Sequence, residues 1–234
     1  MKYAVGRISG KSSTSKPPPP PPAAPPNAKN VLFIIADDLR PQLAAAYGHS
    51  WMKTPNIDKF TSRSMVFLRA FVQQQVCSPS RNSFMTGRRP DATGVWNFND
   101  DFRISRPTGD PEDTRPGRGA DWTTLPQYFK QHGYQVYGTG KLFHPDRPMN
   151  NDLPKSWTEY AKNGHGQHNK TCNKGRVLLA KTKNASTEQG NLWQKILGCE
   201  ENDDEALLTN AAIAFLHKAV GSNRPFFIGM GHRT

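Results

Sequence analysis

Short apolar runs alternate along this chain with stretches in which apolar residues recur every three or four positions. The clearest run is 31–36, which is rich in β-branched residues and is followed by two carboxylates, a pattern typical of a buried parallel strand. Further strands are predicted at 65–72, 134–137 and 225–230. Helices are predicted at 55–64, 77–87, 124–133 and 204–220. This alternation predicts an α/β protein with a mainly parallel sheet flanked by helices.

Residue spacing also predicts which side chains face the core. In the helix that begins at Cys77, Phe84 and Met85 are expected to point inward. In the last helix, Leu207, Ala211, Ala214 and Phe215 recur at helical spacing and are expected to form the apolar face.

The chain divides into a tail and one domain. Residues 1–29 are rich in Ser, Lys and Pro, with prolines unbroken from Pro17 to Pro22, and they predict a disordered or polyproline II tail. Residues 30–234 are long enough for a single sizeable domain.

The net charge of the chain indicates which classes of ligand it can bind. The chain has 31 Lys and Arg against 19 Asp and Glu, a net charge of +12, which favours a polyanion such as nucleic acid, anionic lipid or a sulfated sugar. The run at 31–36 is the longest clean apolar one and is too short to span a bilayer, so we expect no transmembrane helix.

Signals for the cellular compartment disagree. The amino terminus shows no apolar secretory signal segment, which favours the cytosol. However, Asn169 and Asn184 begin glycosylation triplets, which favours a secretory route. Cys172 and Cys199 flank that stretch, and pairing them would leave Cys77 as the reactive thiol; the alternative is three reduced thiols.

Polar residues recur where the predicted strands end. Asp37 and Asp38 follow the first strand, Lys141 and His144 follow a later one, and His232 follows the last. The carboxyl ends of parallel strands meet at one sheet edge, where ligands bind in open α/β folds. Carboxylates can hold a divalent cation, whereas the lysine and the imidazoles can neutralise an oxyanion or carry protons. This inventory suits phosphoryl or sulfuryl transfer.

Cys77 stands at a helix start, one turn before Arg81. The unpaired N–H groups and the dipole of a helix start favour an anionic thiolate or ligand, and the guanidinium can bind a tetrahedral oxyanion. The alternative is a small buried apolar cysteine.

The stretch Cys77-Ser-Pro-Ser-Arg81, continued by Phe84-Met-Thr-Gly87, resembles the signature of the sulfatase family in the alkaline phosphatase superfamily. In that family the core Cys-x-Pro-x-Arg is read by the formylglycine-generating enzyme, which oxidises the cysteine to Cα-formylglycine. The resemblance runs from about Asn30 to the last residue, with further matching stretches at 35–40, 54–58, 140–145 and 231–232.

The resemblance implies an alkaline-phosphatase-like core that hydrolyses sulfate esters of an anionic saccharide, rather than binding nucleic acid. Asp37, Asp38 and the modified Cys77 would bind Ca²⁺, and Cys77, as a hydrated formylglycine, would be the nucleophile. One hydroxyl attacks sulfur, the alcohol leaves, and the other hydroxyl expels sulfate by reforming the aldehyde. Arg81 and Lys141 would stabilise the nucleophile and the sulfate oxygens.

Two histidines complete the implied set. His144 would assist the diol or its breakdown, and His232 would contact the sulfate and protonate the leaving alkoxide. Lys141 and His232 would therefore also be substrate-binding residues. The family's secretory route implies a lysosomal or secreted location.

The sequence departs from the family in one respect. Sulfatases carry a further Asp-His or Asp-Asn pair and a further Lys in a later segment, which this sequence does not contain. We therefore expect the amino-terminal part of a sulfatase, with an incomplete core and calcium site. The alternatives are a catalytically incomplete remnant that binds polyanions, and a phosphatase or phosphodiesterase of the same superfamily.

Overall fold

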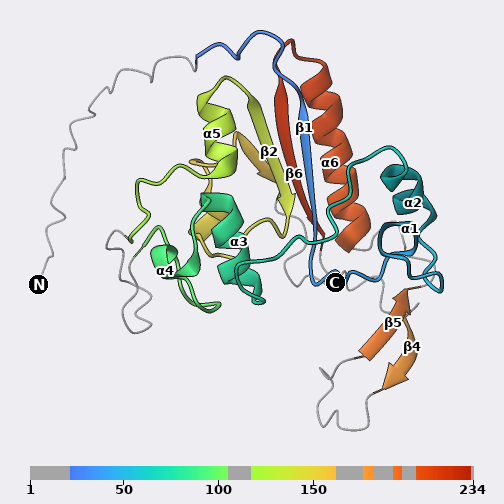
Figure 1. Ribbon diagram of the computed structural model, residues 1–234. Coiled ribbons are helices and arrows are strands. Elements are labelled where there is room, and N and C mark those ends of the chain that lie inside the picture. Colours follow the sequence, from blue (N-terminus) through green and yellow to red (C-terminus); the bar gives the residue numbers. More distant parts are fainter. Residues whose placement is uncertain (1–21, 105–116, 162–175, 182–191, 197–203, 233–234) are drawn as a thin grey trace, which may run out of the picture.

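A parallel sheet of four strands forms the centre of the protein (Figure 1). The computed structural model describes residues 22–104, 117–161, 176–181, 192–196 and 204–232. The sheet order is β1 (Val31–Ala36), β6 (Phe226–His232), β2 (Gln135–Gly140) and β3 (Glu159–Ala161), and every pairing is parallel. The predicted α/β class with a mainly parallel sheet is confirmed.

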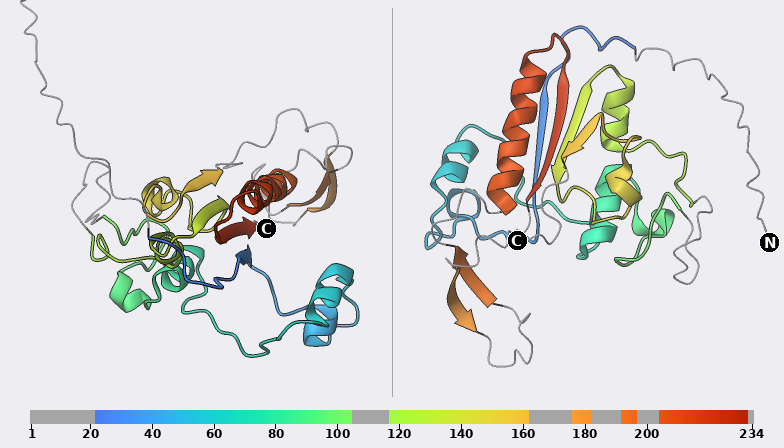
Figure 2. Two further views of the ribbon diagram at one scale, coloured as in Figure 1. Left: turned by 90° about the horizontal axis from the view of Figure 1, so that it is seen from above. Right: turned by 180° about the vertical axis from the view of Figure 1, so that it is seen from behind.

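Helices cover both faces of this sheet (Figure 2). Helix α6 (Asp204–Val220) packs on β6 and β2, and helix α5 (Leu125–Gln131) packs on the other face beside α3 (Cys77–Thr86). Alternation along the strands separates the two cores: Val136 and Phe227 join the cluster that includes Met85, whereas Tyr137 and Ile228 join the cluster of α6.

The helix boundaries follow local chemistry. Helix α5 begins with a capping box, in which the Thr124 side chain accepts from the Gln127 backbone N–H and the Gln127 side chain accepts from the Thr124 N–H. Helix α3 ends at Gly87, whose φ of 66° is the left-handed conformation that glycine adopts readily.

Short elements fill the connections. They are α1 (Ala44–Tyr47), α2 (Pro55–Thr61), α4 (Pro90–Thr93), the 3₁₀ helix η1 (Met149–Asp152) and a separate antiparallel pair, β4 (Arg176–Lys181) and β5 (Leu192–Ile196). Strand β3 and this pair lie in a region where the sequence showed little periodicity, so pattern alone did not predict them.

A buried ion pair anchors the loop that precedes α5. Nε and Nη2 of Arg103 donate to the two carboxylate oxygens of Asp152 at 2.9 and 2.7 Å, and Nη1 donates to backbone carbonyls that include Trp122 O at 2.6 Å. Both side chains are less than a tenth exposed. This bidentate pair fixes two long connections against each other.

The predicted strand at 65–72 is wrong. This segment forms no strand, and its apolar side chains are unusually exposed, with Met65 at 81% and Phe71 at 85%. A strand needs a neighbour that accepts its backbone hydrogen bonds, and the segment runs outside the described sheet. Strand β1 is also less buried than predicted, because it lies at the edge of the described sheet and α6 packs over β6 and β2: Leu32 and Ile34 are 48% and 56% exposed.

Two predicted helix faces need correction. Met85 is fully buried as expected, but Phe84 is 37% exposed. In α6 the predicted Phe215 is buried, but the rest of the buried face is formed by Leu208, Ala212 and Ala219 in place of Leu207, Ala211 and Ala214, and Ala214 is exposed. Periodicity alone therefore located the buried face of α6 only to within one residue.

Some predictions concern residues that are not described. Cys172, Cys199, Asn169 and Asn184 lie outside the described residues, as do residues 1–21 of the tail. Within the described part of the chain, no helix combines the length and the apolarity needed to cross a bilayer.

Candidate active site at the carboxyl edge of the sheet

Three adjacent strands deliver the predicted polar residues to one edge. Ala36 of β1 pairs with His232 of β6, and Gly140 of β2 pairs with Gly231. The Lys141 backbone N–H, just after β2, donates to the Gly231 carbonyl at 2.8 Å. The residues that follow β1 and β2 therefore lie on either side of the end of β6.

Asp37 is the centre of the cluster. Its Oδ1 accepts from Nη2 of Arg81 at 2.7 Å, and its Oδ2 pairs with Nζ of Lys141. Burial raises the pKa of Asp37, but hydrogen bonds and charges from Lys141 and Arg81 outweigh it, and the pKa lies below the ordinary 3.8. The ionised carboxylate therefore fixes two cations beside it.

Arg81 is held on several sides. It is 3% exposed, and besides Asp37 its Nη1 donates to the backbone carbonyls of Lys141 and Leu142. Because α3 supplies Arg81 and the connection after β2 supplies these carbonyls, the guanidinium joins helix and sheet at the site. A charge held in this way needs little rearrangement to meet an anion.

Cys77 is the first residue of α3, and its side chain is half-buried at the cluster. Its Sγ lies 3.5 Å from Nζ of Lys141 and 3.7 Å from Oδ1 of Asp37. Among the described residues it is the free cysteine. The side chain thus sits beside a cation and at the positive end of a helix, which suits a nucleophilic oxygen or sulfur.

The carboxylates and the thiol could hold part of a metal site. One ligand atom each from Asp37, Asp38 and Cys77 lie within 4.8 Å of one another. Asp38 is exposed and has a φ of 50°, so the backbone turns sharply directly after Asp37. Carboxylate oxygens suit calcium, which takes six to eight oxygen ligands, so the two aspartates fit the ion but supply only part of its shell, and the sulfur of Cys77 adds no suitable ligand.

His144 is an uncharged member of the site. Burial, and then the positive charges of Lys141 and Arg81, lower its pKa to about 4, although Asp37 acts in the opposite direction. Its ring stacks on Phe98 with centroids 4.7 Å apart, and its buried Nδ1 makes no hydrogen bond to any described residue. The lowered pKa keeps this imidazole neutral at physiological pH and makes it a weaker base than an ordinary histidine.

His232 pairs with a residue that the sequence did not single out. Its Nδ1 contacts Oε2 of Glu205, which lies in the first turn of α6. Phe98 was missed in the same way. Neither residue follows a strand or belongs to a motif, so only the folded chain relates them to the two histidines.

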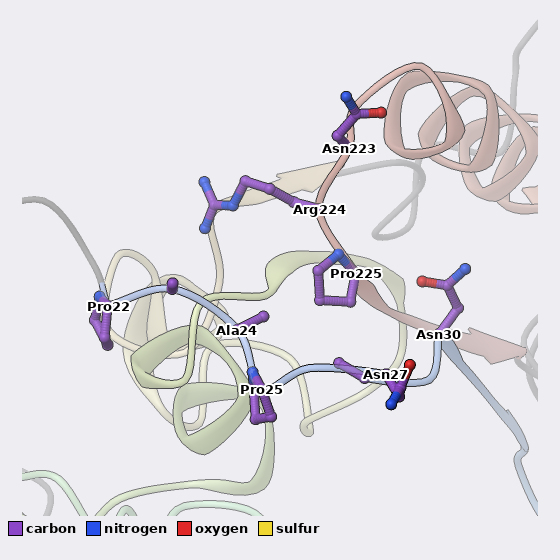
Figure 3. A pocket seen from close by; sticks show the side chains of 10 residues that line it. Pro22, Ala24, Pro25, Asn27, Asn30, Asn223, Arg224 and Pro225 are labelled. Carbon is purple, nitrogen blue, oxygen red and sulfur yellow. The ribbon is translucent and has the colours of Figure 1, made fainter.

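The cluster opens into a cavity of about 400 Å³, whose walls include Asp37, Cys77 and Arg81 together with apolar residues such as Val72 and Phe84. A larger hollow of about 790 Å³ lies at the other end of the sheet, between 22–30 and 223–225 (Figure 3). Two of its polar side chains already have partners: Arg224 donates to Gly133 O, and Asn30 accepts from Phe226 N–H. The chemistry therefore belongs to the smaller cavity.

The structure thus brings Asp37, Cys77, Arg81 and Lys141 into direct contact, with His144 beside them and His232 on the adjoining strand. A parallel α/β sheet with clustered cations and a nucleophile at its carboxyl edge defines a class of proteins that bind an anionic ligand there. The chain belongs to the sulfatase family, whose model, described as Sulfatase, matches residues 29–231.

Comparisons with individual proteins agree. Iduronate 2-sulfatases of Mus musculus and Homo sapiens are 37% identical over 216 residues, which cover 88% of this chain and 35% of each relative. The chain therefore spans about a third of the length of these relatives.

Among solved structures, phosphonate monoester hydrolase of Agrobacterium radiobacter superposes with a TM-score of 0.59 at 19% identity, over 88% of this chain and 41% of its own. A protein solved with its substrate D-glucosamine-2-N,6-O-disulfate superposes with a TM-score of 0.56 at 19% identity, over 88% and 34%. These likenesses confirm the predicted alkaline-phosphatase-like fold.

Proposed function

We propose that this chain carries the nucleophile and the anion-binding half of a calcium-dependent sulfuric ester hydrolase that removes sulfate from a sulfated sugar. The observation that carries the proposal is the position of Cys77, with Sγ 3.5 Å from Nζ of Lys141 and beside the Asp37–Arg81 pair. Attack on a sulfate ester places negative charge on the sulfate oxygens, so fixed positive charges must lie close to the nucleophile. Here the nearby cations are Lys141 and Arg81.

Residue roles follow from the contacts. A hydrated formylglycine at residue 77 would supply the nucleophilic oxygen and a second hydroxyl, and Asp37, Asp38 and residue 77 would hold a calcium ion that adds positive charge at the site. Asp37 holds Arg81 and Lys141 in place, and these two cations stabilise negative charge on the sulfate oxygens.

The histidines move protons in this proposal. His144, neutral above a pH of about 4, accepts a proton from the hydroxyl at residue 77. His232 donates a proton to the sugar oxygen as its bond to sulfur breaks, so the alcohol departs without a negative charge. Lys141 and His232 then also contact the bound sulfate.

The proposed substrate is a 2-sulfated iduronate within an anionic saccharide, since the name of the iduronate 2-sulfatases gives that sugar and that position for those relatives. Two features of this chain support that choice: the Arg88-Arg89 pair directly after the signature, and the net charge of +12, which suits an anionic chain of sugars.

A mass measurement on the peptide that contains Cys77 tests the proposal. After expression with a formylglycine-generating enzyme, conversion of the thiol to the aldehyde removes about 18 Da, and Arg81→Ala, which breaks the Cys-x-Pro-x-Arg pattern, should lower the conversion. Sulfate release from a 2-sulfated disaccharide, with and without a calcium chelator, then tests the reaction. Unmodified cysteine from a host that converts a control sulfatase would overturn the proposal.

A second candidate is a polyanion-binding remnant without turnover. It is favoured by the same net charge and by the small number of calcium ligands that the described residues provide. Binding of heparan-type sugars without sulfate release would support it. Release of phosphate instead of sulfate would support the phosphatase alternative, which the cysteine in a maturation pattern disfavours.

The cellular route is part of the same proposal. We place the protein in the lysosome or outside the cell, with a Cys172–Cys199 disulfide and glycans on Asn169 and Asn184. Peptide mapping without reduction, before and after removal of N-glycans, tests both modifications. Reduced cysteines and bare asparagines in protein from a secretory host would refute this part alone.

A further inference from the structure

A carboxylate on α6 contacts the histidine at the end of β6. Nδ1 of His232 and Oε2 of Glu205 form a hydrogen bond, although the residues are 27 positions apart. The packing below them explains the meeting, because Leu208, one turn after Glu205, is buried against Met230, two residues before His232. Helix α6 and strand β6 therefore pack against each other directly beside the two residues.

The histidine of this pair borders the candidate active site. His232 is in register with Ala36, the residue before Asp37, and the preceding Gly231 accepts from the backbone N–H of Lys141 at 2.8 Å. An imidazole at this point lies between the strands that carry the central carboxylate and the lysine. Where His232 contacts the sulfate, as the proposed function has it, the orientation of the ring decides which nitrogen faces the ester.

A carboxylate on one ring nitrogen selects the tautomer. Nδ1 must carry a proton to donate to Glu205, so Nε2 is the nitrogen that remains for the substrate. The two side chains are 35% and 31% exposed, so water screens part of their attraction, but the directional preference of the hydrogen bond persists.

We infer that Glu205 is a positioning residue for His232: it accepts the Nδ1–H hydrogen bond, so that Nε2 faces the ester and, when the ring carries a second proton, gives that proton to the leaving oxygen. The identity of the group that Nε2 meets rests on the proposed function, whereas the pairing itself does not. A competing role for Glu205 is purely structural, since a negative charge in the first turn of a helix stabilises that helix. The two roles predict different spectroscopic results.

The test is the tautomer of His232 in the whole chain, measured by ¹⁵N NMR with labelled histidine at a pH about two units above the ordinary imidazole pKa. We expect the Nδ1–H form in the unaltered protein, a shift toward the Nε2–H form in Glu205→Ala, and retention of Nδ1–H in Glu205→Gln, whose amide oxygen still accepts. Glu159→Ala is the matched control, because it removes a comparable partly exposed ion pair, with Lys218, elsewhere on the sheet.

A purely structural role predicts the opposite: Glu205→Ala lowers the melting temperature while His232 keeps its Nδ1–H tautomer, and that result overturns the inference. The proposed function is tested separately with formylglycine-bearing protein and a 2-sulfated disaccharide. If Glu205→Ala shifts the tautomer but the unaltered protein releases no sulfate, the proposed function is refuted and the positioning role is supported. Where sulfate is released, Glu205→Ala should lower kcat about tenfold or more, with Glu205→Gln recovering part of it.

Discussion

The most direct test of the site's construction is to neutralise Asp37. This carboxylate is 6% exposed and pairs with both Arg81 and Lys141, whose side chains are also largely buried. Asp37→Asn keeps the shape and one acceptor but leaves two cations facing each other without a counter-charge. Removing one partner of a buried ion pair costs about 3 to 5 kcal/mol.

Because the amide still accepts one hydrogen bond, we expect the lower end, a loss of about 3 kcal/mol in the free energy of unfolding. For a chain of this size that corresponds to a fall of about 6 to 12 °C in melting temperature. The assay is urea unfolding followed by circular dichroism, in a chelator so that metal binding does not contribute. Asp38→Asn is the matched control, because it makes the same change in an exposed neighbour and should cost less than about 0.5 kcal/mol.

The stabilisation that Asp37 provides should depend on pH in a definite direction. The folded-state pKa of Asp37 lies below its unfolded value, so its contribution is complete above the unfolded pKa and disappears as the pH falls through the lowered value. The difference between the unaltered protein and Asp37→Asn should therefore be constant near neutral pH and shrink below a pH of about 4. Equal losses for Asp37→Asn and Asp38→Asn would refute the ion-pair reasoning.

Three further predictions concern other parts of the chain. The ring signals of His144 should stay constant in an NMR titration until the pH approaches about 4, and this group should make folding less stable as the pH falls from about 6.5 toward that value; a midpoint near 6.5 would contradict its burial among cations. Arg103→Met should lower the free energy of unfolding, measured in the same urea assay, by about 3 kcal/mol, because it leaves Asp152 buried without its partner. Arg118→Met is the control and should have little effect, because Arg118 is exposed. Phe71→Ser should leave that free energy within about 0.5 kcal/mol but reduce self-association in light scattering, because the ring is 85% exposed; unchanged scattering would show that this surface does not drive association.

Much of the fold followed from local patterns. The run Val31–Ala36, the helix from Cys77 to Gly87 and the last helix and strand were predicted from apolar periodicity and from residues that begin or end helices. The same reasoning failed at 65–72, where an apolar run suggested a strand. Composition reveals the tendency to form a strand, but not whether a neighbouring strand is present to pair with it.

For the candidate site too, some features follow from the sequence and others only from the tertiary structure. The sequence by itself determined the chemical inventory, namely the signature around Cys77 and the polar residues after each strand, because strand ends and motifs are local features. Only the tertiary structure decided which atoms meet. Asp37 pairs with Arg81 and Lys141 across 44 and 104 positions, because β1, β6 and β2 lie side by side in an order that no local pattern encodes. The partnership of Glu205 with His232 has the same origin, since it depends on how α6 packs against β6.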